Sequence, residues 1–253
     1  MTTSLRNRMH TGDILAGTFL KTPAHELIEV LALSGLDFLC LDAEHAPFDR
    51  ARTDACLAVA RALDMPVLVR VPWGRPEHIQ MALDAGATGI VVPHVSSADV
   101  AAEIARTARF GAHGRGFAGS TRWAGYGTAR MPELLAKSAE ETIVVAMIEE
   151  PEGVAAAAEI AATPGIDALM LGPADLSVAL GKTDQTSPEL ADAYRTVGAA
   201  CALQNTTFAT WVPNADAAAE RHASGVRMFF TASEHSWMLQ GARTAAAGLK
   251  SLA

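Results

Sequence analysis

Short apolar runs alternate with helix-like stretches along the chain of 253 residues, and each kind occurs eight times. The apolar runs predict strands at Ile14–Phe19, Phe38–Leu41, Val67–Val71, Gly89–Pro93, Ile143–Ile148, Ala168–Leu171, Phe208–Trp211 and Met228–Thr231. The other stretches are rich in Ala, Leu and Glu, and they predict helices at Ala24–Ser34, Asp49–Leu63, Pro76–Ala85, Ser97–Arg109, Pro151–Ala161, Pro188–Gln204, Ala215–Ala223 and Ser233–Gly248. Strict alternation is typical of a parallel sheet covered by helices, and eight units close into a barrel. The sequence therefore predicts an α/β fold, a single (β/α)8 TIM barrel domain over residues 1–253.

One segment interrupts this regular order. Gly111–Arg130 follows the fourth strand and its helix, contains several glycines, and is too long for an ordinary connection. Long loops of this kind usually cover a site or an interface. We expect the same of this one.

The composition excludes several classes of protein. Hydrophobic residues make up 50% and charged residues 19% of the chain, so a disordered chain is not expected. No apolar run approaches the roughly 18–20 residues of a membrane span, and the N-terminus lacks the apolar core of a signal peptide. A net charge of −8 disfavours nucleic acid as a partner. Cys40, Cys56 and Cys201 form neither a disulfide framework nor a metal-binding spacing, which favours a reducing compartment. We expect a cytoplasmic protein with small-molecule ligands and neither a nucleic-acid nor a membrane partner.

Polar or aromatic residues follow seven of the predicted strands, at the end of a barrel where catalytic groups lie. From the second strand to the eighth they are Asp42, Glu44 and His45; Arg70; Pro93 and His94; Glu149; Asp175; Trp211; and Thr231 and Ser233. Two carboxylates, a histidine and an arginine in one barrel mouth predict a site for a divalent cation and an oxyanion. No lysine sits at these strand ends, which disfavours Schiff-base chemistry.

Each of these residues also has a structural interpretation. His45 could be a solvent-exposed or helix-capping histidine. Glu149 comes just before Pro151 and could be a dipole partner at a helix start, and Asp175 could be a simple first-turn acid. Arg70 could form a structural salt bridge. The coincidence of several polar strand ends favours a functional interpretation more than any one residue does.

Six motifs in strand order carry a family resemblance that covers nearly the whole chain. The motifs are Asp42-Ala43-Glu44-His45-Ala46-Pro47, Arg70-Val71-Pro72, Leu83-Asp84-Ala85-Gly86-Ala87, Val92-Pro93-His94-Val95, Ile148-Glu149 and Gly172-Pro173-Ala174-Asp175-Leu176-Ser177. With these motifs the chain resembles the metal-dependent class II pyruvate aldolases, the HpcH/HpaI hydroxy-ketoacid aldolases of the phosphoenolpyruvate/pyruvate barrel superfamily.

The resemblance implies roles for residues of most of these motifs. Glu149 and Asp175 would be the protein ligands of a Mg²⁺, Mn²⁺ or Co²⁺ ion, which pyruvate would chelate through a carboxylate oxygen and its keto oxygen. Backbone N–H groups near Ala174 and Asp175 would hold the pyruvate carboxylate, with Gly172 and Pro173 in the same substrate-binding motif. Arg70 would donate to the keto or enolate oxygen.

The resemblance also implies which residue transfers protons. His45 would be the acid/base, with Asp42 or Asp84 raising its basicity. Trp211, at the seventh strand end, is expected to contact the substrate. Members of this family typically exchange the C-terminal helix between neighbours, so we expect a homo-oligomer, a hexamer.

One position departs from the family pattern. Met147 stands where these enzymes usually have glutamine, two residues before the metal-binding glutamate. A glutamine can hydrogen-bond a bound keto acid, whereas a thioether cannot donate a hydrogen bond and is too soft to favour Mg²⁺. We expect activity to persist with altered efficiency or substrate choice.

The sequence therefore predicts a lyase that cleaves and forms 4-hydroxy-2-oxo acids from a 2-oxo acid, pyruvate or hydroxypyruvate, and an aldehyde. One alternative is an acyl-CoA lyase of the same superfamily, of malyl-CoA or citramalyl-CoA type. Another is a keto-acid-binding protein whose catalysis is weakened by Met147.

Overall fold

The eight strands of the barrel are all parallel and hydrogen-bond in sequence order, with β8 returning to β1. They appear in a computed structural model that describes residues 4–252. They are β1 (Leu15–Leu20), β2 (Phe38–Asp42), β3 (Val67–Arg70), β4 (Gly89–Val92), β5 (Ile143–Ile148), β6 (Ala168–Leu171), β7 (Thr207–Val212) and β8 (Met228–Ser233). The predicted (β/α)8 TIM barrel is confirmed, and every predicted strand agrees with the observed one to within two residues at each end.

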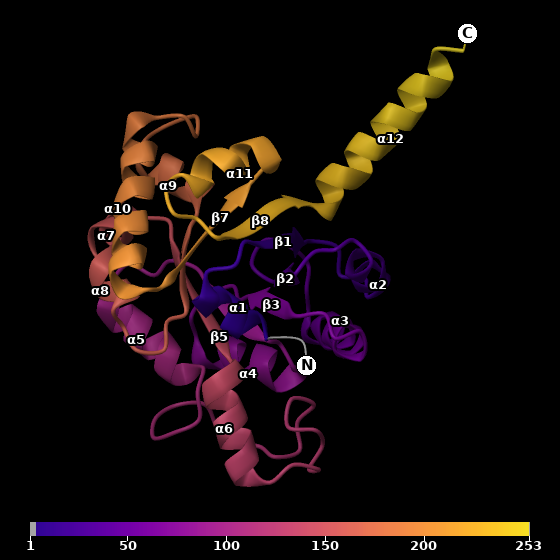
Figure 1. The fold of residues 1–253 in the computed structure, drawn as a ribbon. Coiled ribbons are helices and arrows are strands. Elements are labelled where there is room, and N and C mark those ends of the chain that lie inside the picture. The colour runs from indigo at the N-terminus through magenta and orange to yellow at the C-terminus, as the bar shows by residue number, and fades with distance from the viewer. Residues whose placement is uncertain (1–3, 253) are drawn as a thin grey trace.

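Most of the helices form an outer layer around this barrel, while α1 lies across one end and α12 points away (Figure 1). They are α1 (Leu5–Thr11), α2 (Glu26–Ala32), α3 (Arg50–Ala62), α4 (Pro76–Ala85), α5 (Ala98–Thr107), α6 (Met131–Glu141), α7 (Pro151–Ala155), α8 (Ala157–Ala161), α9 (Pro173–Ala179), α10 (Pro188–Gln204), α11 (Ala215–His222) and α12 (Glu234–Lys250). The predicted helix over residues 151–161 is two short helices, and α1, α6 and α9 were not predicted. None of these additions alters the barrel order.

Alternation along the strands divides the apolar residues between two layers, because successive side chains point to opposite faces. On β2, Phe38 and Cys40 join the cluster inside the barrel, whereas Leu39 and Leu41 pack in the cluster beneath the helices. Leu5 and Met9 of α1 belong to the interior cluster, so α1 closes the N-terminal end of the barrel. The opposite end is left for polar side chains.

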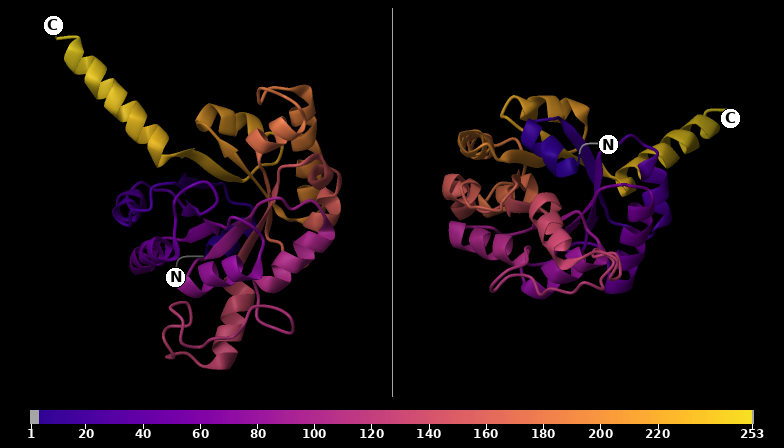
Figure 2. Two further views of the ribbon diagram at one scale, coloured as in Figure 1. Left: turned by 180° about the vertical axis from the view of Figure 1, so that it is seen from behind. Right: turned by 60° about the horizontal axis from the view of Figure 1, so that its bottom comes forward.

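Two parts of the chain project from the barrel. The segment over residues 111–130 has no helix or strand, and with α6 it forms the lobe at the bottom of Figure 1. Helix α12 leaves the end of β8 and extends away from the body, as both views of Figure 2 show. No helix within residues 4–252 has the length and apolar character needed to cross a membrane.

Candidate active site

A cavity of about 330 Å³ opens at the C-terminal ends of the strands. It is lined by Phe19, Lys21, His45, Arg70, Met147, Met170, Gly172, Pro173, Ala174, Asp175, Gln185, Trp211, Ala232, Ser233 and Ser236. The structure thus brings together most of the residues that the sequence grouped in one site.

Asp42 and Arg70 form a buried ion pair beneath this cavity. They are register partners on β2 and β3, and Arg70 donates from Nε to Oδ1 at 3.0 Å and from Nη2 to Oδ2 at 2.7 Å. The Phe19 ring lies 4.5 Å from the guanidinium carbon. Burial by itself raises the pKa of Asp42, but hydrogen bonding and charge from Arg70 outweigh it and hold the pKa below its ordinary value.

The structural interpretation of Arg70 therefore applies alongside the functional one. Two of its nitrogens are used by Asp42, while Nη1 forms no hydrogen bond within residues 4–252 and the side chain lines the cavity. Arg70 is held rigidly and still offers donors to a ligand.

His45 lies just beyond β2 with 55% of its side chain exposed. Its backbone N–H donates to Asp42 Oδ1 at 3.1 Å, so Asp42 fixes the backbone of this loop and makes no recorded contact with the imidazole. The carboxylate beside the ring is that of Glu44, with Oε2 3.6 Å from Nε2. Burial raises the pKa of Glu44, opposed by the charges of Arg70, His45 and His94.

Glu149 follows β5 and is almost completely buried. Its Oε1 accepts the backbone N–H of His94 at 2.9 Å and lies 3.2 Å from Nδ1 of the same histidine. Burial is the main cause that raises the pKa of Glu149 to about 7; His94 lowers it, whereas the charges of Asp175 and Glu44 raise it further. Glu149 is therefore a buried acid in a group of like charges.

His94 was noted in the sequence only as a strand-end residue and given no role. Its φ of 57° lies in the left-handed region, which side chains other than glycine adopt at a cost. This conformation accompanies the backbone hydrogen bond to Glu149, while the imidazole stacks on Trp73 with ring centroids 5.1 Å apart.

Asp175 lies in the first turn of α9 and lines the same cavity. Next to it, a Cβ added at Gly172 would lie 2.8 Å from Met147 Cε and 3.1 Å from Glu149 Oε2, so glycine keeps the space beside Glu149 open. The carboxylate oxygens of Glu149 and Asp175 suit a hard divalent cation that completes its coordination with water and substrate oxygens. Within residues 4–252, no group of three or more His, Cys, Asp or Glu side chains is arranged to hold a metal, so a cation here would rely on these two carboxylates.

Met147 and Trp211 give the cavity apolar surface. Met147 is 4% exposed and points inward with the interior cluster. The Trp211 indole Nε1 donates to the Ala232 carbonyl oxygen at 3.1 Å, so its N–H group is already used.

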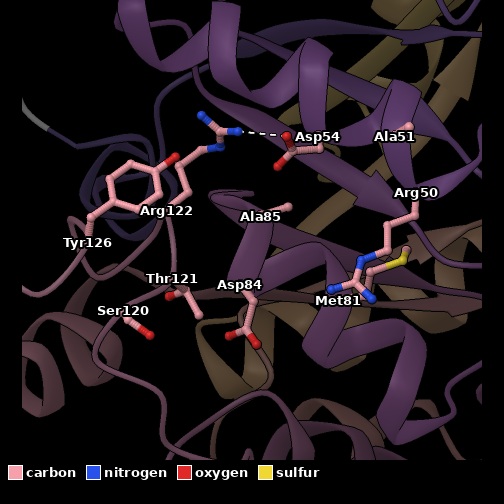
Figure 3. Close-up of a pocket in the computed structure, with 10 residues that line it drawn as sticks. All are labelled: Arg50, Ala51, Asp54, Met81, Asp84, Ala85, Ser120, Thr121, Arg122 and Tyr126. Carbon is pink, nitrogen blue, oxygen red and sulfur yellow. Dashed lines mark hydrogen bonds and ion pairs between the residues drawn. The ribbon is translucent and has the colours of Figure 1, made fainter.

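Asp84 does not line this cavity. It accepts from Arg115 Nε at 3.1 Å and lines a separate pocket of about 620 Å³, in which Arg122 and Tyr126 of the 111–130 segment face helices α3 and α4 (Figure 3). The structure therefore does not bring Asp84 to His45 within one chain.

Sequence reasoning missed Lys21, Phe19, Gln185 and Ser236. The strand ends it considered began with the second strand, and β1 ends at Leu20, one residue later than predicted, with Lys21 directly after it. No lysine lies at the strand ends that were considered, but Lys21 follows β1, whose end was not among them. Lys21 was detectable as the first charged residue after the first apolar run.

Sequence and structure comparisons show which known proteins this chain is similar to. Residues 15–238 match the HpcH/HpaI aldolase/citrate lyase family. The chain is 32% identical to a hydroxypyruvate/pyruvate aldolase from Paraburkholderia phytofirmans over 252 residues, 96% of each chain. It is 38% identical to a 5-keto-4-deoxy-D-glucarate aldolase from Klebsiella pneumoniae over 164 residues, 64% of this chain and 63% of that protein. A crystal structure of an HpcH/HpaI aldolase/citrate lyase family protein from Burkholderia cenocepacia superposes with a TM-score of 0.92 at 33% identity, covering 98% of this chain and 100% of that one.

Proposed function

The chain belongs to the HpcH/HpaI aldolase/citrate lyase family, and from that premise we propose that it is a class II aldolase. In this proposal it adds pyruvate or hydroxypyruvate to an aldehyde and cleaves the resulting 4-hydroxy-2-oxo acid. One observation carries the proposal: Asp175, His45 and Arg70 line one cavity. Glu149 is buried close enough to Asp175 for that charge to raise its pKa.

Carbon–carbon bond formation from pyruvate begins with loss of a methyl proton, and negative charge then builds on the keto oxygen. A divalent cation held by Glu149 and Asp175, which we propose to be Mg²⁺, Mn²⁺ or Co²⁺, would stabilise that charge as a Lewis acid. Arg70 would donate to the same oxygen from Nη1, while Asp42 and Phe19 keep the guanidinium in place.

The proton itself is assigned to His45. Its imidazole would accept the methyl proton of pyruvate and later return a proton to the aldehyde oxygen. Glu44, 3.6 Å away, would stabilise the positive charge that the ring gains. Asp84 stays a proposed partner of His45 only between copies of the chain, because within one copy it pairs with Arg115 in a separate pocket.

The start of α9 would hold the carboxylate of the 2-oxo acid. The Leu176 N–H donates to the Gly172 carbonyl at 3.1 Å, so the N–H groups of Ala174 and Asp175 precede the first hydrogen bond of the helix. Such N–H groups lack partners within the helix and are suited to an anion.

Exchange of the pyruvate methyl protons with D₂O, followed by NMR, tests this proposal without any aldehyde. We expect exchange with Mn²⁺ or Mg²⁺ present, loss of exchange in excess chelator, and recovery when metal is restored. His45→Ala should slow exchange by roughly two to four orders of magnitude, the usual contribution of a positioned acid/base. His25→Ala is the matched control, because this partly exposed histidine lies outside the cavity.

Two results would contradict the proposal. One is full exchange in excess chelator. The other is a covalent pyruvate adduct trapped by borohydride on Lys21, the lysine that lines the cavity, since this would assign Schiff-base chemistry to the site.

A further inference from the structure

His94 lies against the buried acid Glu149, and the proposed reaction leaves its side chain without a role. Its backbone N–H donates to Glu149 Oε1 at 2.9 Å, and its imidazole Nδ1 lies 3.2 Å from the same oxygen. His94 follows β4 and Glu149 follows β5, and these two strands are neighbours in the barrel. One residue therefore brings two nitrogen atoms to a single carboxylate oxygen.

The turn after β4 places the backbone N–H of His94 on this carboxylate. Pro93 has no N–H to donate, and the chain rejoins β5 where the Val95 N–H donates to the Met147 carbonyl oxygen at 3.1 Å. Between them His94 has a φ of 57°, in the left-handed region that histidine, asparagine and aspartate adopt more often than other side chains. Glycine would satisfy this turn at less cost, so a histidine here points to a use for its side chain.

Three side chains hold the imidazole of His94 in one orientation. Trp73 stacks on it, with ring centroids 5.1 Å apart and an angle of 30° between the ring planes. Glu150 Oε1 lies 3.2 Å from Nδ1, the atom that also faces Glu149, and Glu44 Oε1 lies 3.9 Å from Nε2. Because two carboxylate oxygens lie close to Nδ1, we assign a proton to this nitrogen.

These contacts use one oxygen of Glu149 and leave the other free. Oε1 faces His94, whereas Oε2 lies on the side of Gly172, 3.1 Å from the position that a Cβ would take there. Gly172 immediately precedes α9, which carries Asp175 in its first turn. Oε2 is therefore the oxygen of Glu149 that lies towards the second proposed metal ligand.

We propose that His94 is a positioning residue for metal binding, which holds Glu149 Oε1 so that Oε2 is presented to the cation. The inference rests on the proposed function, because it takes Glu149 and Asp175 as the ligands of a divalent cation. Groups that fix a metal-binding side chain from behind contribute about 10- to 100-fold to metal affinity. His94 thus strengthens metal binding without contacting the metal or the substrate.

Binding of Mn²⁺ to the protein tests this role without turnover. Free Mn²⁺ would be measured by electron paramagnetic resonance at one fixed pH. His94→Gly keeps the left-handed turn at no steric cost and removes the imidazole, and we expect it to weaken Mn²⁺ binding about tenfold or more. His94→Asn should keep most of the affinity, because asparagine tolerates this turn and its amide nitrogen can donate near the position of Nδ1.

His113→Gly is the matched control for the backbone. His113 has a φ of 59°, so the substitution makes the same change of side chain in the same backbone conformation. It lies in the segment over residues 111–130, which contributes no residue to the cavity. We expect the Mn²⁺ affinity of this variant to equal that of the wild-type protein.

Four outcomes would overturn the inference: unchanged Mn²⁺ affinity in His94→Gly, tighter binding in that variant, no recovery in His94→Asn, and an equal loss in His113→Gly. A wild-type protein that binds no Mn²⁺ would overturn both this inference and the proposed function. Binding that depends on His94 without exchange of pyruvate protons would keep the inference and lose the proposed reaction. Metal-dependent exchange with a Mn²⁺ affinity indifferent to His94 would do the reverse.

Discussion

Asp42 has three hydrogen bonds to its carboxylate and is completely buried, so its charge should contribute strongly to stability. Asp42→Asn would leave the buried Arg70 guanidinium with only the longer ion pair to Glu44, whose Oε2 lies 3.4 Å from Nε. Removing one partner of a buried pair usually costs about 3 kcal/mol or more, and we expect a loss of this size in the free energy of unfolding, measured by urea denaturation. Asp13→Asn removes the partly exposed partner of Arg8, and should cost less than about 1 kcal/mol. Equal losses in the two variants would contradict this account.

The same ion pair predicts how stability depends on pH. The pKa of Asp42 is held below its ordinary value, so near the ordinary pKa of about 3.9 the unfolded chain binds more protons at this residue than the folded one. The stabilisation is complete above that range and is lost as the pH falls through the folded-state pKa. We expect the wild-type protein to lose its stability advantage over Asp42→Asn on acidification below about pH 4. An advantage that grows on acidification would contradict this reasoning.

Met147 lies beside Gly172 at the base of the cavity, where glutamine could reach a bound 2-oxo acid. Met147→Gln should add one hydrogen bond of about 1 kcal/mol, equivalent to roughly fivefold in affinity. We expect pyruvate to bind more tightly by this factor, with the metal requirement unchanged. Calorimetry with pyruvate on the Mn²⁺-loaded variant measures the effect. Unchanged affinity would mean that the side chain at this position does not contact the ligand.

The strand pattern predicts which strand residues point into the barrel. It does not predict site residues that lie beyond a strand end or in an unusual turn. Asp42, Arg70 and Met147 continue the inward alternation of their strands, and this period of two is visible in the sequence. Lys21 was missed because the end of the first strand was not among the strand ends considered, although Lys21 is the first charged residue after that strand. The hydrogen bond from His94 to Glu149 accompanies a left-handed backbone at a residue other than glycine, which no pattern of side chains announces.

At the scale of elements, Arg115 is the buried anchor of the segment over residues 111–130, which Arg122 also ties to Asp54 on α3. The Arg115 side chain is buried and packs against the rings of Phe110 and Trp123, 4.6 and 4.9 Å from their centroids, and it donates to Asp84. Arg115→Met should loosen this segment while the barrel strands keep their protection. We expect amide exchange across residues 111–130 to rise about tenfold, the factor given by 1.4 kcal/mol of lost local stability.

Hydrogen–deuterium exchange read by mass spectrometry would measure this change. Arg106→Met is the matched control, because Arg106 makes an exposed pair with Glu103 on α5. Exchange that rises equally in the barrel strands would show that Arg115 supports the whole fold and not this segment alone.

Low burial does not explain which helices sequence periodicity failed to predict, since α11 buries no residue and α12 only Glu234, and both were predicted. Helices α1 and α9 have only seven residues each, too short for a repeat of 3.6 residues to be recognised. Helix α6 is longer and buries only Leu134 and Ser138. The break at Ala156 between α7 and α8 lies in an alanine-rich stretch whose composition is uniform.

At the scale of the whole molecule, α12 is a helix that extends away from the barrel and packs little of its surface against it. Glu234 is the sole buried residue of its seventeen, and Met238, Leu239 and Leu249 are each at least half exposed. Full burial of such a side chain is worth about 1.5–3 kcal/mol. A second copy of this chain is the partner we propose for α12, as part of a homo-oligomer, a hexamer.

The mass in solution tests this assembly. Light scattering should give a multiple of the 26.5 kDa chain, six copies in our proposal. Leu239→Asp would place a charge in the apolar surface of α12, and we expect it to shift the protein towards smaller species, because burying an unpaired carboxylate is costly. Leu203→Asp makes the same change at an exposed leucine of α10, and should leave the mass unchanged. A wild-type protein of 26.5 kDa at micromolar concentration would exclude the assembly and leave α12 without a partner.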